Sequence, residues 1–200
     1  MKVGLILECG RGGPDEQVCA YLARCIASEI ELTCVTLVNK ARLMAECGAA
    51  ATALLRDGCE RVVIVWDLFP KWRRPGETHC RGRDRTEIIQ TLANAGLRSR
   101  PVYLVCIEEE LEAWLLSDER ALSNILSTPA HPVRVSRLRH PETLRNPKVR
   151  LLKLFQQSSR GRYNDMLHAV RIVQAMPDFT RIRRCPSFAR FVERMTGRPL

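Results

Sequence analysis

Acidic side chains follow three apolar runs of this chain. Glu8 comes directly after KVGLIL, and Asp67 comes directly after RVVIVW. Glu110 and Glu112 belong to the acidic segment EEELE, which follows VYLVCI. Carboxylates without a histidine among them suit a hard cation such as Mg²⁺ or Mn²⁺, which binds a few carboxylates and keeps waters for substrate phosphates. These four residues and Asp84 are our candidate metal ligands.

Each of these positions also has a purely structural interpretation. Asp67 is suited to capping the turn before a proline-containing loop. Glutamates are favourable in the first turn of a helix because they complement the helix dipole. Four acids within residues 108–112 exceed that need, however, and such close like charges repel unless a cation or a basic group lies among them.

Four short apolar runs, rich in β-branched residues, predict buried strands that alternate with helices. The expected strands span residues 2–7, 32–38, 62–66 and 102–107. The expected helices span residues 15–28, 41–56, 84–96 and 108–116, with Asp84 and Glu87 at the spacing of a capping box. This order predicts an α/β fold, Rossmann-like, with a parallel four-stranded sheet flanked by helices. Glu8, Asp67 and the acidic segment should then meet at one edge of the sheet.

The composition changes after residue 126. We expect residues 1–126 to form the α/β core and residues 127–200 to form a basic helical extension packed on it. A connector rich in proline and arginine should lead to helices at 148–157, 164–175 and 187–195. Residues 127–200 hold 16 basic and 4 acidic groups, so this extension has a net charge of +12 while the whole chain has +10.

The charge pattern indicates a polyanionic partner, most simply nucleic acid. Of the 32 basic residues, 27 are arginine, whose planar fork suits bidentate contacts with phosphate. The basic loop 68–83 adds Phe69 and Trp72, which suit either stacking on bases or anchoring of the loop. The expected nucleic-acid contacts are Arg73, Arg74, Arg81, Arg83, Arg181, Arg183 and Arg184. The alternative is a solvated basic surface in a genome that prefers arginine codons.

The sequence also indicates the setting of the protein. No apolar run approaches the roughly 20 residues needed to cross a bilayer, so we expect a soluble, cytoplasmic protein without membrane contact. Nine cysteines without a CxxC pair predict reduced, mostly buried thiols.

Several segments carry a family resemblance. A glutamate after the first strand, an aspartate after a later one and a third acidic motif resemble the Toprim domains of topoisomerases, primases and nucleases of the overcoming-lysogenization-defect type. The chain more closely resembles a bacterial family of unknown function grouped with the Toprim superfamily. The segments that carry this resemblance are ECG (8–10), VIVWDLFPKW (63–72), CRGRD (80–84), ELEAWLLSD (110–118), NPK (146–148) and RCPSF (184–188).

The resemblance implies a Toprim-like core and Mg²⁺-dependent phosphodiester chemistry, in some cases beside a partner ATPase in phage-defence operons. One departure matters, because the Toprim DxD motif reads Asp67-Leu68-Phe69 here and lacks its second aspartate. Either Asp84, Glu110 or Glu112 supplies that ligand, or the site no longer does chemistry.

Two functions follow as expectations. The first is a metal-dependent nuclease, with Glu8 as metal ligand or general acid/base and Asp67 as principal ligand. In that enzyme Arg81 and Lys148 would stabilise phosphate charge. The second is a catalytically degenerate nucleic-acid-binding or adaptor subunit of an ATPase-containing complex.

Overall fold

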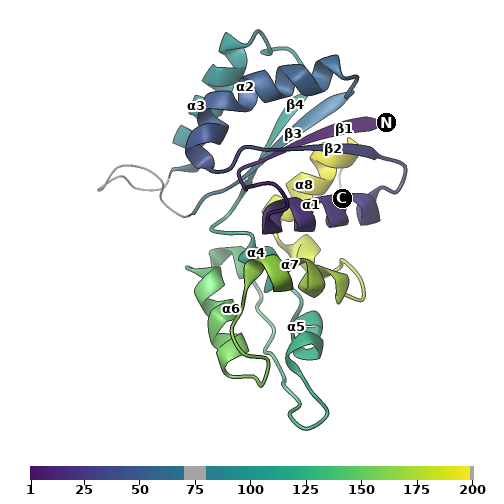
Figure 1. Cartoon of the computed structure of the whole chain (residues 1–200), viewed down its shortest axis with the longest axis vertical. Coiled ribbons are helices and arrows are strands. Elements are labelled where there is room, and N and C mark those ends of the chain that lie inside the picture. The colour runs from purple at the N-terminus through teal and green to yellow at the C-terminus, as the bar shows by residue number, and fades with distance from the viewer. Residues whose placement is uncertain (70–79, 199–200) are drawn as a thin grey trace.

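A computed structural model describes residues 1–69 and 80–198 of the chain (Figure 1). Its centre is a sheet of four strands, β1 (Lys2–Leu7), β2 (Glu31–Thr36), β3 (Arg61–Asp67) and β4 (Val102–Ile107). All neighbouring strands are parallel, and their order across the sheet is β2-β1-β3-β4. The predicted α/β fold with a parallel four-stranded sheet flanked by helices is confirmed.

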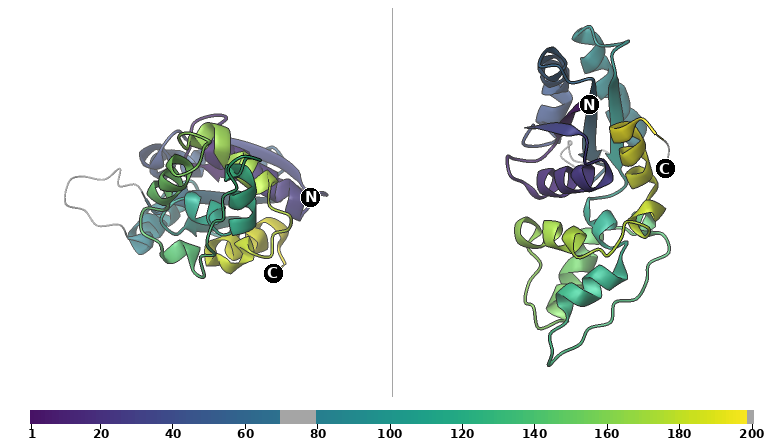
Figure 2. Two further views of the ribbon diagram at one scale, coloured as in Figure 1. Left: turned by 90° about the horizontal axis from the view of Figure 1, so that it is seen from below. Right: turned by 90° about the vertical axis from the view of Figure 1, so that its right-hand side faces the viewer.

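Helices cover both faces of the sheet (Figure 2). The first face packs against α1 (Pro14–Ile26) and α8 (Pro186–Thr196), and the second packs against α2 (Lys40–Arg56) and α3 (Arg81–Asn94). In β3, Val63 and Val65 face the first layer while Ile64 and Trp66 face the second. Burial on both faces is why this strand is apolar without alternation.

The remaining helices form a helical part at the carboxyl end of the sheet (Figure 1). It contains α4 (Glu112–Leu115), α5 (Glu119–Leu126), α6 (Pro147–Gln156) and α7 (Asp165–Gln174), with 3-10 turns at Pro141–Thr143 and Ile182–Arg184. The expected helices at 148–157, 164–175 and 187–195 are therefore present within two residues at each end.

Trp114 joins the helical part to the sheet. Its ring is fully buried and lies 5.3 Å from the ring of Phe188 and 5.6 Å from that of Phe191, both on α8. Its indole N–H donates to Ser187 Oγ at 2.7 Å. Beyond α8, Gly197 has a φ of +74°, and Arg61 donates to the carbonyl of Arg194 at 3.0 Å. The end of α8 is thus fastened to the start of β3.

Two predicted helix starts are wrong. The helix expected over residues 108–116 is a single turn, α4, because Glu109 adopts a left-handed φ of +65° and its carbonyl accepts from the N–H of Phe69 at 2.7 Å. The helix expected to open at Asp84 begins at Arg81, so Asp84 lies inside the first turn and does not form the predicted capping box.

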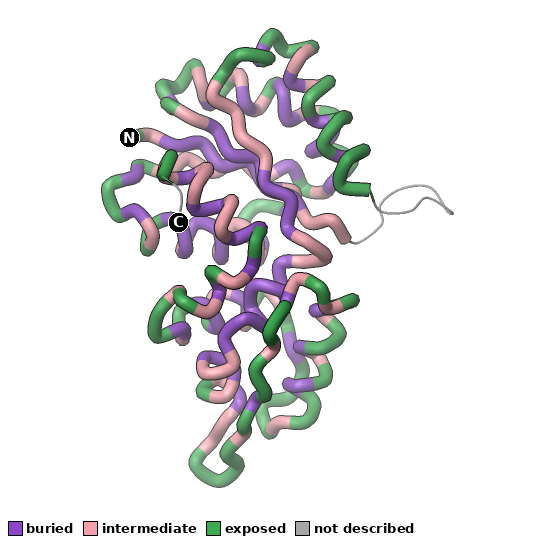
Figure 3. The backbone as a smooth tube through the Cα atoms, turned by 180° about the vertical axis from the view of Figure 1, so that it is seen from behind, coloured by how far each residue is buried: buried purple, intermediate pink, exposed green. Residues whose placement is uncertain are grey.

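Buried and exposed residues follow the division into a central sheet and surrounding helices (Figure 3). The strands are mostly buried, and exposed residues gather on the outer sides of the helices and at the tip of the helical part. All nine cysteines are free thiols and six of them are buried, as expected. In the described ranges, no helix combines the length and apolar character needed to cross a membrane.

Candidate functional site

Glu8 and Asp67 lie at the switch point of the sheet topology, between β1 and β3. β1 and β3 are neighbours, with Leu7 paired to Val65, so the two acids follow adjacent strand ends. The helix after β1 covers one face of the sheet and the helix after β3 covers the other. Open α/β sheets bind ligands at such a switch point, outside the carboxyl ends of the strands.

Asp67 is held through one of its two carboxylate oxygens. Its Oδ2 accepts a hydrogen bond from the N–H of Leu111 at 3.1 Å. Its Oδ1 is buried and has no hydrogen-bond partner among residues 1–69 and 80–198. Burial raises the pKa of Asp67 well above its usual value, and the charges of Asp15, Glu8 and Glu112 raise it further. These three acids are therefore the electrostatic neighbours of Asp67.

Glu8 repeats this arrangement on the neighbouring strand. Its Oε2 is buried, and nothing in the described part of the chain hydrogen-bonds to it. Burial raises the pKa of Glu8 to about 8; the ammonium of Lys40 opposes this rise, while Asp15 and Asp84 add to it. A buried carboxylate with a free oxygen costs free energy unless a proton or a cation neutralises it.

Asp15 is a member of the site that the sequence analysis missed. It lies in the first turn of α1, where an acid is expected on helix-dipole grounds alone. Burial raises its pKa to about 6, although Lys148 lowers it. The signal that could have found Asp15 is its position, because the N-terminus of the helix after β1 lies at the same edge as Glu8.

Glu112 approaches the site from the helical part. Its side chain is buried; Tyr163 donates to Oε1 at 3.3 Å, and Lys148 Nζ lies 3.8 Å from the same oxygen. Burial raises its pKa to about 7, while Lys148 lowers it. Lys148 also pairs with Asp165. The lysine at the start of α6 is thus surrounded by the protein's own carboxylates, which makes its position at a helix N-terminus favourable.

Glu110 has a different environment from Glu112. Its Oε2 accepts from the backbone N–H of Lys148 at 3.2 Å, so it caps the first turn of α6. Burial raises the pKa of Glu110, and the hydrogen bond from Lys148 opposes that rise. Of the two predicted ligands in the acidic segment, Glu112 is the one that acts on the pKa of Asp67.

Asp84 belongs to a buried ion pair. Lys40 Nζ lies 3.5 Å from Asp84 Oδ2, with both side chains 5% exposed, and it donates to the carbonyl of Leu68 at 3.0 Å. No sequence pattern singles out Lys40, which opens α2 and is separated from Asp84 by more than forty residues. Asp84 therefore raises the pKa of Glu8 and forms an ion pair with Lys40.

The predicted nucleic-acid contacts occupy several environments. Arg81 pairs with Glu108, and Arg181 pairs with Glu119. Arg184 donates to the carbonyls of Ser117 at 2.7 Å and Leu138 at 3.0 Å. Arg83 and Arg183 are exposed, and Arg73 and Arg74 lie outside the described residues. Arg181 and Arg184 thus have structural contacts that the sequence analysis did not foresee.

Four acids, Glu8, Asp15, Asp67 and Glu112, influence one another at this edge, flanked by Lys40 and Lys148. We call them the carboxylate cluster. The pKa of each member is raised, chiefly by burial. In the described ranges, no three Asp, Glu, His or Cys side chains lie close enough together to form a ready metal site. The free oxygens of Glu8 and Asp67 nevertheless suit a cation, because they are acceptors without donors.

Comparison with known proteins identifies one family. Residues 15–196 match the family model described as "Domain of unknown function (DUF4276)". The match includes Asp15, Asp67 and Glu112 and begins after Glu8. No curated protein and no solved structure matches the chain.

Proposed function

This chain belongs to the DUF4276 family, and we propose that it is a metal-dependent phosphodiesterase with a Toprim-like core that acts on nucleic acid. The observation that carries the proposal is the pair of buried oxygens, Glu8 Oε2 and Asp67 Oδ1, that lack partners among the described residues at the switch point of the sheet. A Toprim-like site places a glutamate after the first strand and an aspartate after a later one, and this chain has that order.

Asp67 and Glu112 are the ligands that we assign to Mg²⁺ or Mn²⁺, with Asp15 as a further neighbour. Glu110 and Asp84 are less suited to replace the aspartate missing at Phe69. Glu110 accepts from the backbone of Lys148, and Asp84 shares a buried pair with Lys40. When bound, the cation would neutralise phosphate charge and lower the pKa of a coordinated water.

Glu8 takes a role either as ligand or as proton acceptor. Its pKa of about 8 means that its free Oε2 exchanges a proton near neutral pH, which is the property of a general acid or base. Lys148 and Arg81 are placed at the carboxyl edge of the sheet, where they would stabilise phosphate charge.

The second candidate is a non-catalytic adaptor that binds nucleic acid, in the setting of a partner ATPase. It is favoured by Phe69 in place of an aspartate and by Lys40 and Lys148, whose positive charges partly neutralise Glu8 and Glu112. In that protein, the raised pKa values would keep several of the acids protonated.

A cleavage assay separates the two candidates. The full chain is incubated with single- and double-stranded DNA and RNA in Mg²⁺, in Mn²⁺ and in EDTA. The phosphodiesterase should cleave only with metal, and Asp67→Asn should reduce the rate by orders of magnitude. Glu60→Gln is the matched control, because Glu60 is 62% exposed just before β3, at the opposite edge of the sheet. Absence of cleavage with every substrate and metal would favour the adaptor.

A further inference from the structure

A groove of about 870 Å³ runs beside β4, the outermost strand of the sheet, between α3 and α8. Its lining includes arginines from α3, from the segment before β4 and from α8, and none of the lining residues within 1–69 and 80–198 is an aspartate or glutamate. These arginines are Arg81, Arg85, Arg98, Arg100, Arg190 and Arg194. We call this hollow the arginine groove. It does not include the carboxylate cluster.

The charge of the groove is only partly balanced by the protein. Arg81 and Arg190 share Glu108, and Arg194 pairs with its neighbour Glu193. Arg85, Arg98 and Arg100 form no ion pair with any carboxylate of the described ranges. This side of the molecule therefore presents several unneutralised guanidinium groups to whatever enters the groove.

Two buried hydrogen-bond donors in the lining also lack an acceptor. Trp66 is 2% exposed, and its Nε1 has no hydrogen-bond partner in the part of the chain that the structure describes. Arg190 Nη2 is buried without a hydrogen bond as well, since Glu108 Oε1 is 3.6 Å away. Both atoms are N–H groups, so the missing partner is an acceptor.

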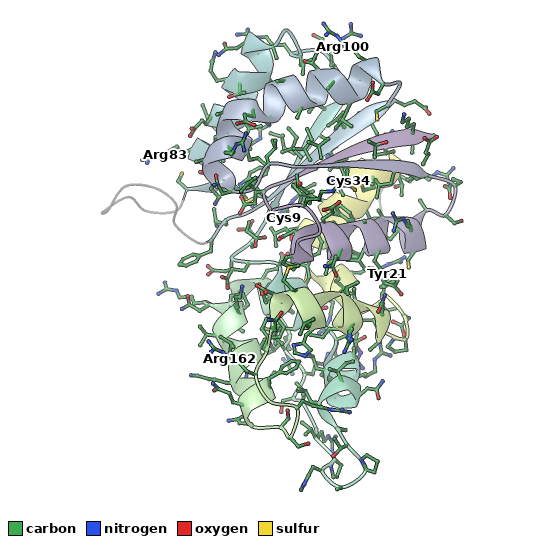
Figure 4. All side chains as sticks on the ribbon, in the orientation of Figure 1. Cys9, Tyr21, Cys34, Arg83, Arg100 and Arg162 are labelled. Atoms are coloured by element: carbon green, nitrogen blue, oxygen red, sulfur yellow. The ribbon has the colours of Figure 1, made fainter. Side chains whose placement is uncertain are left out.

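The groove has a direction. It begins near Arg100, before the start of β4, which Figure 4 labels at the end of the molecule away from the helical part. It ends at Arg81 and Arg190, which contact Glu108 directly after β4, a path of roughly 20 Å for a six-residue strand. A second hollow of about 420 Å³ shares Arg81 and Arg190 and continues toward the helical part. The groove therefore leads from the far end of the sheet to its carboxyl edge.

We propose that the arginine groove binds the sugar-phosphate backbone of a single-stranded nucleic acid and guides it toward the carboxylate cluster. The inference rests on the proposed function for the identity of the ligand. Phosphates supply both the negative charge that six arginines match and the acceptors that Trp66 and Arg190 lack.

The main alternative occupant is an acidic peptide that pairs with β4 as a fifth strand. Such a peptide would satisfy the backbone of β4, which is the usual mode of strand addition. The free donors, however, are side chains of Trp66 on β3 and Arg190 on α8, and a strand paired with the β4 backbone would not use them. A polyanion with acceptors at every repeat fits these positions better.

The test measures binding of a fluorescent 20-nucleotide single strand by anisotropy, with EDTA present to prevent cleavage. Charge reversal of Arg85, Arg98 and Arg100 to Glu should raise Kd at least tenfold. It should also reduce the salt slope by about 2, since each lost contact to a single strand contributes about 0.7. The matched control reverses Arg134, Arg139 and Arg150, exposed arginines of the basic extension, and should change Kd less than threefold.

A charge-neutral variant tests the missing acceptor. Trp66→Phe removes one N–H donor and should raise Kd about fivefold with an unchanged salt slope, the loss expected for one hydrogen bond. Circular dichroism melts ensure that each variant is folded. An equal loss of affinity in the two triple variants would overturn the inference. Competition by an unlabelled duplex or by polyglutamate as strong as competition by an unlabelled single strand would overturn it as well.

The outcomes separate this inference from the proposed function. If binding depends on the groove arginines but no cleavage is found, the proposed phosphodiesterase activity is rejected and binding by the arginine groove is retained. Metal-dependent cleavage whose KM is the same in wild type and in the Arg85, Arg98 and Arg100 variant would remove the groove and leave the phosphodiesterase.

Discussion

Asp67 Oδ2 accepts a hydrogen bond from the N–H of Leu111 at 3.1 Å, which connects the end of β3 to the segment after β4. The bond orients the carboxylate, and its Oδ1 stays buried without a partner in the described residues. Asp67 is therefore held in place by one oxygen while the other is available to a ligand. This division makes Asp67 the best single residue for testing the site.

Thermal melts should reveal a cation at Asp67. We expect Mg²⁺ to raise the Tm of wild type and to have no effect on Asp67→Asn, because a ligand that binds only the folded state stabilises it, by about 2.7 kcal/mol at 100 times Kd. Differential scanning fluorimetry at fixed ionic strength measures this. Glu60→Gln should respond like wild type, and identical Mg²⁺ responses of wild type and Asp67→Asn would count against a metal site.

Stability of the metal-free protein should fall as the pH rises from about 5 to 8. Glu8, Glu112 and Asp15 have folded-state pKa values of about 8, 7 and 6, above their ordinary values. The folded state therefore binds more protons than the unfolded state in this window, and the stability that these protons contribute is lost as they leave. Urea unfolding in EDTA measures the profile. Glu8→Gln should flatten its upper part, and a stability that rises across the window would contradict the assignment.

Lys40→Met should destabilise the fold by about 3–5 kcal/mol, because it removes the cationic member of a buried ion pair and the donor to the carbonyl of Leu68. Chemical denaturation measures the loss, and the double variant Lys40→Met, Asp84→Leu should recover much of it. The matched control on the same helix is Arg42→Met, which removes an exposed pair with Glu46 and should cost less than about 1 kcal/mol. Equal effects of the two single variants would show that burial of the pair is unimportant.

Arg184→Met should lower stability by about 1–3 kcal/mol, because it leaves the carbonyls of Ser117 and Leu138 without their donor. The neighbouring exposed residue gives the comparison, and Arg183→Met should change stability by less than about 0.5 kcal/mol. Both are measured by urea denaturation. If the two variants are equally stable, Arg184 is available for an external partner, as its sequence context suggested.

The sequence was sufficient for the sheet and for two members of the site. Apolar runs bounded by polar residues predict each strand, and Glu8 and Asp67 are recognisable because they end two of those strands. Glu109 could not be predicted, because its left-handed φ depends on a hydrogen bond with Phe69. Asp15 was not recognised because the helix dipole already explains an acid in the first turn of a helix.

The features that the sequence did not predict depend on contacts between segments that are distant in the chain. Lys40 and Asp84 form a pair only because α2 and α3 lie side by side on one face of the sheet. The arginine groove likewise combines residues on both sides of β4, from α3 and from α8, which no local pattern connects. The division at residue 126 stays a prediction.

The position of α8 has a consequence for synthesis of the protein on the ribosome. Phe188, Phe191 and Val192 of this helix cover the same sheet face as Val105 and Ile107 of β4, and the entire helical part is translated between them. The part of this face that α8 covers is therefore exposed to water while α4 to α7 are made, a state prone to aggregation. The helical part is thus an insertion between β4, a strand of the sheet, and α8, a helix that packs on the sheet. A ribosome-bound chain that ends before Pro186 should therefore bind chaperones. A chain whose residues up to Gly197 have left the ribosome should not bind them.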